Sequence, residues 1–387
     1  MRKVLLLGFL VLSSLAYAQT NFMISKYFPS GDIAETIWIK VQNSDTIYHG
    51  SYTSYYPEGR VMQEGFYHEG KPDSVWLTYH RFGARKSKFT YKNGVRSGEF
   101  KFWYEGGGLY QYGYYRNDLL NGILVTYHPN GKVDSESNYA DGVLDGPSTV
   151  YSSEGVIRLK LSYANGLEDG AWESFFETGE VNYRGKKENG KFVDTLYTYY
   201  KNGTVQRKAF YLKGVITGVM TGYYPDGAVM NTMNYLNGEI TGTYSAFFPG
   251  GAIAETGSYS SNKRNGAWRS FFPSGSLNSY GDFVNDSLDG LWTVLYENGA
   301  LRQKGYYVSG NKAGEWLFYN SKGQFVMQGF YFNGLPENIW IIYYPNGSVA
   351  GRVAFKRGRQ FGAAYLFGEN GELTKSMNFK IPENFSR

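Results

Sequence analysis

The sequence contains no cysteine and only four histidines. Without cysteine, disulfide frameworks, thiol catalysis and cysteine-based zinc sites are excluded. The sequence also lacks a large excess of one charge sign, because it has 39 basic and 34 acidic residues, and no run of lysine and arginine stands out. Proteins that bind nucleic acid normally gather basic residues into a patch or stripe. We therefore expect no nucleic-acid partner.

Long apolar runs are missing after the first 18 residues. Arg2-Lys3 forms a positive start, residues 4–12 form a short apolar run, and residues 16–18 read Ala-Tyr-Ala. This order is typical of a cleaved signal peptide, and the run is too short to span a bilayer. We predict a signal peptide at 1–18 with a mature chain from Gln19. The chain is then exported to the periplasm, outer surface or extracellular space, with no transmembrane segment after cleavage.

Glycine and aromatic residues are abundant, with 50 Gly, 37 Tyr and 26 Phe among 387 residues. Aromatic side chains suit a pleated surface, whereas glycine breaks helices and supplies turns. The hydrophobic content of 42% is enough to bury a core. The composition therefore predicts an ordered chain made of strands.

A 24-residue period runs through the sequence. Counting from Gly59 in steps of 24, all fourteen positions are glycine, with no insertion or deletion. These are Gly59, Gly83, Gly107, Gly131, Gly155, Gly179, Gly203, Gly227, Gly251, Gly275, Gly299, Gly323, Gly347 and Gly371. A constant step predicts that each unit occupies the same space in a stack.

Other positions of the unit repeat as well. An aromatic residue stands eight places after the glycine in thirteen of fourteen units, and four places before it in thirteen of fourteen. Six of the eight tryptophans share one position: Trp76, Trp172, Trp268, Trp292, Trp316 and Trp340. These repeated positions predict that every unit places its large side chains in the same way.

The unit from Gly266 to Phe283 illustrates the predicted hairpin. Residues 267–272 form one strand, Pro273-Ser274-Gly275 forms the turn, and residues 276–283 form the return strand. Proline presets φ at the start of a turn, and glycine accepts a positive φ at its end. A glycine-rich loop then leads to the next unit. The predicted fold class is all-β, an array of 24-residue antiparallel β-hairpin repeats forming an elongated, twisted meander or solenoid-like sheet.

The ends of the chain depart from the period. A fifteenth copy of the turn ends at Gly31, 28 residues before Gly59, so four extra residues fall between them, around 43–46. We predict an irregular N-terminal cap repeat over 19–54, fourteen repeats over 55–379 and a C-terminal tail over 380–387. Caps of this kind hide the unpaired edges of a repeat array.

The unit can be written G-x-Y-x-N-G-x-x-x-G-x-W-x-x-Y-Y-P-N-G. One stretch matches it at Gly329, Tyr331, Asn333, Gly334, Trp340, Tyr343, Tyr344, Pro345, Asn346 and Gly347, with Asn338 in place of the middle glycine. The unit resembles the MORN repeat, and is more similar to the bacterial MORN-variant repeat of antitoxin-like proteins, over roughly residues 50–380.

The resemblance implies a hairpin-repeat fold and a role in binding or scaffolding. Eukaryotic MORN repeats are linked to membrane attachment and phospholipids, and the bacterial variant carries an antitoxin label by genomic association. An antitoxin normally meets its toxin in the cytoplasm, whereas this chain carries a predicted export signal. We therefore rank an antitoxin-like role below a scaffold role.

The histidines and carboxylates do not form a predicted catalytic, cofactor or metal site. His80 and His128 share one position of the unit but lie two units apart, about 19 Å at the spacing of strands. Acidic residues such as Asp282, Asp286 and Asp289 are expected in tight turns on backbone grounds. His49 and Asp45 in the cap are the remaining candidates for a hydrolase site. We expect no enzyme activity and no cofactor.

The aromatic residues next to the turns offer a candidate binding surface. Successive strand residues point to opposite faces, so one aromatic column is expected to be exposed. The alternative is cross-strand stacking that holds a thin sheet together. The candidate binding-face residues are Tyr56, Tyr200, Tyr224, Phe248, Phe272, Tyr296 and Tyr344.

The sequence thus predicts a non-catalytic, exported repeat scaffold that mediates protein–protein interaction at the cell envelope or outside the cell. The alternative is a glycan- or cell-wall-binding array that uses the exposed aromatic columns. The partner is accordingly a protein or a glycan.

Overall fold

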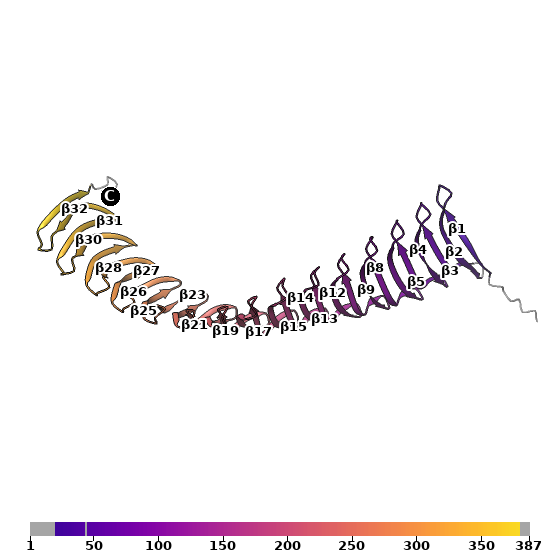
Figure 1. The fold of residues 1–387 in the computed structure, drawn as a ribbon, viewed down its shortest axis with the longest axis horizontal. Helices are drawn as coiled ribbons and strands as arrows, with labels where there is room; N and C mark the ends of the chain where they lie inside the picture. Colours follow the sequence, from indigo (N-terminus) through magenta and orange to yellow (C-terminus); the bar gives the residue numbers. More distant parts are fainter. Residues whose placement is uncertain (1–19, 43–44, 380–387) are drawn as a thin grey trace, which may run out of the picture. The chain divides into compact units, whose positions relative to one another are not determined.

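The computed structural model describes residues 20–42 and 45–379. The predicted signal peptide and the predicted tail lie outside these residues. Within them every regular element is a β-strand, every recorded pairing is antiparallel, and no helix is long and apolar enough to cross a membrane. The predicted all-β class and the repeating antiparallel hairpins are confirmed (Figure 1).

The described residues divide into two compact units, with the boundary between Glu168 and Asp169. The strands of the first unit are β1 (Thr20–Tyr27), β2 (Ile33–Gln42), β3 (Asp45–Tyr55), β4 (Val61–His68), β5 (Lys71–Tyr79), β6 (Arg85–Lys92), β7 (Val95–Arg96), β8 (Gly98–Trp103), β9 (Leu109–Arg116), β10 (Leu119–Leu120), β11 (Gly122–Tyr127), β12 (Val133–Ala140), β13 (Val143–Tyr151) and β14 (Ile157–Ala164). Strand β15 (Leu167–Phe175) begins just before the boundary.

The second unit contains the remaining strands, which again follow one another in chain order (Figure 1). They are β16 (Val181–Glu188), β17 (Lys191–Tyr199), β18 (Val205–Leu212), β19 (Val215–Tyr223), β20 (Val229–Leu236), β21 (Glu239–Phe247), β22 (Ile253–Ser260), β23 (Lys263–Arg264), β24 (Gly266–Phe271), β25 (Leu277–Val284), β26 (Ser287–Leu295), β27 (Leu301–Val308), β28 (Asn311–Tyr319), β29 (Phe325–Phe332), β30 (Leu335–Tyr343), β31 (Val349–Lys356), β32 (Arg359–Phe367) and β33 (Leu373–Phe379).

The glycine that defines the period closes a tight turn, as predicted. Between β19 and β20, the Gly227 N–H donates to the Tyr224 carbonyl (2.9 Å), and the Tyr224 N–H donates to the Ala228 carbonyl (2.8 Å). Gly227 has φ 90°, in the left-handed region that favours glycine. This is a type I turn followed by a left-handed glycine, a common hairpin connection. The predicted strands 267–272 and 276–283 are observed as β24 and β25. Each lies one residue further from the turn than predicted, because Phe272 already belongs to the turn.

The predicted glycine-rich loop is wrong, because a second tight turn stands in its place. Between β20 and β21, Asn237 and Gly238 have φ values of 50° and 87°, and Leu236 pairs directly with Glu239. Two residues with positive φ are the mark of a type I′ hairpin turn, whose twist suits paired strands. Each unit is therefore strand, turn, strand, turn.

A β-bulge accounts for the other glycine of the predicted loop. Gly242 has φ 71°, and the β20–β21 register shifts between Met233 and Tyr235. Asn338, which replaces the glycine in β30, adopts φ 61° at the same place. A bulge increases local twist, so the repeated bulge twists the sheet at the same point of every repeat.

The hairpin formed by β2 and β3 is longer than the others. Gln42 at the end of β2 pairs with Asp45 at the start of β3, and these strands have 10 and 11 residues. A typical pair such as β20 and β21 has 8 and 9 residues. The four extra residues therefore lengthen both strands of this hairpin.

The 33 strands of the described residues form one sheet, and the core lies on one face of it, which we call the core face. Trp316 in β28 is completely buried between Gly305 in β27 and Gly329 in β29, with which it pairs directly. A Cβ atom added to Gly305 would lie 2.2 Å from Trp316 Cδ2. The glycine therefore leaves the space that the indole ring fills. We call the opposite face the open face.

Candidate functional site: a groove on the open face

The aromatic residues predicted to bind stand at the first position of the period-defining turn and are half-buried. The hydroxyl group of Tyr224 donates to the carbonyl of Phe247 in the next repeat (2.8 Å). The same inter-repeat hydrogen bond is made by Tyr56, Tyr200, Tyr296 and Tyr344, at 2.8–3.0 Å. Phe248 and Phe272 occupy the same position without a hydroxyl group. These side chains therefore join neighbouring repeats, and their role in binding stays a prediction.

Two histidines take the place of this tyrosine. The His80 Nε2 atom lies 3.3 Å from the Trp103 carbonyl, and the His128 Nε2 atom lies 3.3 Å from the Tyr151 carbonyl. Both carbonyls are 23 residues further on, the same step as for tyrosine. Each imidazole thus reproduces the inter-repeat contact.

Several carboxylates accept hydrogen bonds from the backbone of a neighbouring repeat. Asp73 accepts a hydrogen bond from the Asn93 N–H (3.0 Å), and this bond is the main reason that the pKa of Asp73 is lowered. Asp118 accepts from both the backbone and the side chain of Arg96, and the side-chain bond lowers the pKa of its carboxyl group most. Across residues 20–42 and 45–379, no group of three or more His, Asp or Glu could hold a metal ion.

Cationic side chains cover parts of the core face. The Lys312 ammonium lies 4.0 Å from the centroid of the Trp316 ring, and its pKa is lowered by burial. The Arg264 guanidinium lies 4.1 Å from the Phe283 ring centroid. Cations over aromatic faces are attracted by the ring quadrupole. The aromatic layer is therefore partly shielded from solvent at these points.

The open face of the second unit carries an exposed apolar row across strands β26 to β31. Leu291 pairs directly with Tyr306, and further along Ile339 pairs with Ala354. The four large members of this row are Leu291, Tyr306, Phe330 and Ile339, with exposed fractions of 43%, 54%, 38% and 58%. Apolar side chains that gather on a surface in this way often mark an interaction site.

Three cavities follow this row in sequence. The first, of about 250 Å³, and the second, of about 540 Å³, share Glu315. The second and the third, of about 380 Å³, share Ile339 and Ala354. Gly305 lines the first and Gly329 the second. A side chain at either position would point to the tryptophans of the core face, so these residues border the cavities with their backbone. Because adjacent cavities share residues, we treat them together as one feature, the open-face groove.

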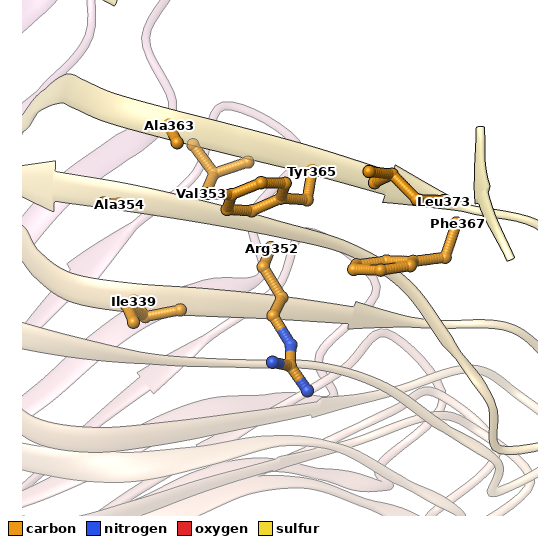
Figure 2. Close-up of a pocket in the computed structure, with 8 residues that line it drawn as sticks. All are labelled: Ile339, Arg352, Val353, Ala354, Ala363, Tyr365, Phe367 and Leu373. Atoms are coloured by element: carbon orange, nitrogen blue, oxygen red, sulfur yellow. The ribbon is translucent and has the colours of Figure 1, made fainter. Parts of the chain in front are cut away.

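The third cavity contains a pair of aromatic residues from β32. Tyr365 and Phe367 lie side by side above Arg352, and Ile339 lies at the opposite end of the cavity (Figure 2). The two ring centroids are 6.5 Å apart, and the Arg352 guanidinium carbon lies 6.0 Å from the Phe367 ring centroid. This end of the groove can contact flat apolar groups and anionic groups.

A second row on the open face carries positive charge. Successive cross-strand pairs connect Arg269 in β24 through Lys304 in β27 to Arg352 in β31. None of these three side chains forms an ion pair with another described residue. We call them the cationic row; it runs beside the apolar row.

Sequence reasoning missed this groove, although a signal was present. Ser258 and Asn234 stand in earlier repeats at the position that Tyr306 and Phe330 occupy in later ones. Phe210 also stands at this position, but alone between Lys186 and Asn234, whereas Tyr306 and Phe330 are large and apolar in consecutive repeats. Apolar residues in consecutive repeats at one position of the unit are the signal that could have indicated the groove.

Comparison with protein families identifies the repeat. The family described as MORN repeat variant matches residues 48–69, 120–141, 216–237 and 288–309. Each match begins at the same position of the 24-residue period. The segment 216–237 covers β19 from its second residue, the glycine turn, β20 and the first residue of the type I′ turn. The chain contains MORN-variant repeats.

The MORN-variant repeat in this chain is thus one hairpin bounded by type I′ turns, and unmatched repeats share the same turns. A comparison with curated proteins found no match.

Two solved structures are similar to the chain. One, described as "Crystal Structure of TcdB2-TccC3", is 12% identical with a TM-score of 0.16, over 92% of this chain and 25% of that one. The other, "Crystal Structure of TcdB2-TccC3 without hypervariable C-terminal region", is 10% identical with a TM-score of 0.15, over 89% and 22%. The chain spans a quarter or less of their length, and similarity at these TM-scores supports no inference about function.

Proposed function

We propose that this MORN-variant repeat protein is a non-catalytic, exported scaffold that binds a partner protein through the open-face groove. The observation that carries the proposal is the exposed apolar row with its three adjoining cavities. Burial of apolar surface is the main favourable term in most protein association. Export is supported by the signal-peptide pattern of residues 1–18.

A photo-crosslinking amino acid placed at Ile339 tests this proposal. On cells that produce the chain, we expect illumination to yield one reproducible protein adduct. The second substitution Tyr306→Glu should greatly reduce it, because a charge in an apolar contact must be desolvated. Val219→Glu is the matched control, since Val219 in β19 is 55% exposed but lies outside the groove. An adduct that forms equally with both variants, or no adduct at all, contradicts the proposal.

A glycan partner is the second candidate, favoured by the adjacent rings of Tyr365 and Phe367 in the third cavity. Aromatic faces suit the flat apolar faces of sugars, and Arg352 beside them suits an acidic group. In the same crosslinking experiment, an adduct that is sensitive to glycosidases and resistant to proteases would favour the glycan over the protein.

A further inference from the structure

The apolar row is spaced like the side chains of an α-helix laid across the strands. The row crosses the successive strands β26 to β31, with Glu315 on β28 and Ala354 on β31 beside its four large apolar members, and neighbouring strands lie about 4.8 Å apart. A helix presents one side chain to a given face per turn, about every 5.4 Å. An extended peptide presents one side chain to a given face about every 6.8 Å, so its side chains lose alignment with the row within about two strands. Five strand spacings, from β26 to β31, correspond to about 24 Å, or about 16 helical residues.

A ligand on this face cannot form backbone hydrogen bonds with the sheet as an added strand would. The backbone groups of strands β26 to β31 pair with neighbouring strands inside the sheet. Recognition therefore depends on side chains, which favours a ligand that is rigid without help from the sheet. A helix satisfies its own backbone and places an apolar stripe against the row.

The cationic row defines the charge of the ligand. Lys304 and Arg352 are four strands apart, about 19 Å, which corresponds to between three and four helical turns. Because neither forms an ion pair with a described residue, both can bind carboxylates of a ligand. Glu315, on the apolar row itself, is exposed and also free of ion pairs, and suits a single basic side chain.

We propose that the open-face groove takes an amphipathic α-helix of a partner protein, with an apolar stripe against Leu291, Tyr306, Phe330 and Ile339 and acidic residues along the flank that faces Lys304 and Arg352. This inference rests on the proposed protein-binding function and names the chemistry of the partner. An extended peptide and an anionic glycan are the competing occupants.

The test uses synthetic peptides of about 18 residues and the full chain. The first peptide has leucine at helical spacing and glutamate along one flank. The second has the same composition arranged with a two-residue period, and the third has lysine in place of glutamate. Binding is measured by fluorescence anisotropy at two salt concentrations, and peptide helicity by circular dichroism difference spectra.

We expect the first peptide to bind best, to gain helicity and to weaken at high salt, because its charge contacts are exposed. Ile339→Glu and the double variant Lys304→Glu, Arg352→Glu should each weaken it by about tenfold or more, whereas Val219→Glu should not. The lysine peptide should bind the double variant better than it binds the unmodified chain. The open-face sites are half-buried or exposed, and an unchanged strand spectrum shows that each variant is folded.

Two results would overturn the helix proposal: equal or tighter binding of the two-residue-period peptide, or binding without gain of helicity. A glycan that competes for the groove while no peptide binds would overturn it as well. The crosslinking experiment separates this failure from that of the proposed function. A protein adduct lost in Tyr306→Glu, with no helical peptide bound, leaves the scaffold proposal standing and the helix proposal refuted.

Discussion

At the scale of single residues, the tryptophans of the core face depend on glycines in the neighbouring strands. Trp316 fills the space above Gly305, and Trp268 and Trp340 stand in the same relation to Gly257 and Gly329. Where the tryptophan position holds Met220, the facing residue is Ala209, and both are buried. Where the residue at the tryptophan position is smaller, the facing residue is larger, so the pair fills a similar volume, as close packing requires.

This relation makes a prediction for Gly305→Ala. The new methyl group would lie 2.2 Å from Trp316 Cδ2, so the indole must move, and overpacking of this kind costs about 1–3 kcal/mol. Adding Trp316→Met reproduces the natural Ala209–Met220 pair and should recover part of the loss. Chemical denaturation should give a coupling energy of about 1 kcal/mol or more between the two changes. Gly305→Ala with Trp268→Met is the control and should be additive.

The tryptophan positions and the aromatic columns could be predicted from sequence, because they recur with the period. The partner of each tryptophan could not. At the bulge, the three residue steps from Ala313 to Trp316 in β28 lie opposite the single step from Gly305 to Tyr306 in β27. Counting residues along the two strands therefore misses which glycine faces which ring.

At the scale of elements, the two turns of each repeat have different chemistry. The glycine turn needs one positive φ, at its last residue, whereas the type I′ turn needs two. The sequence predicted a turn at the first of these places and a glycine-rich loop at the second. The second turn is less regular in sequence, since Lys213, Ser309 and Arg357 stand where Asn237 does, all with φ near 50°.

Lys213→Asn should stabilise the chain. Lys213 has φ 51°, a conformation that asparagine adopts more readily than other side chains with a Cβ atom. We expect a gain of about 0.5 kcal/mol, seen as a small rise in the thermal midpoint by circular dichroism. Lys213→Ala removes the same side chain without this preference and serves as the control. A gain of equal size with alanine would show that the lysine side chain, and not the turn, is responsible.

At the scale of the whole molecule, the period acts as a structural register. Joining Gly227 directly to Ala252 removes residues 228–251 and leaves the sequence of the turn and the following strand in phase. The fold class and the repeat were predictable because each repeat contacts mainly its neighbours. The groove was not, because its depth depends on the sizes of side chains from several strands at once.

Deletion of residues 228–251 should therefore give a folded chain with an unchanged strand spectrum and a cooperative thermal transition. Deletion of residues 228–247 removes fewer residues but breaks the register of the turn, the bulge and the core positions. We expect this shorter deletion to lower the thermal midpoint more than the longer one. Equal midpoints for the two deletions would contradict a fixed 24-residue register.

The inter-repeat hydrogen bond of the turn tyrosines has a mechanical consequence. Each of these bonds ties a turn to a carbonyl 23 residues ahead, so a pull at right angles to the strands acts on repeats linked in series, which share the tension and yield separately. Each repeat that yields releases 24 residues, roughly 80 Å of extended chain. A sheet built in this way lengthens under tension in equal small steps, and the repeats that have not yielded keep their fold.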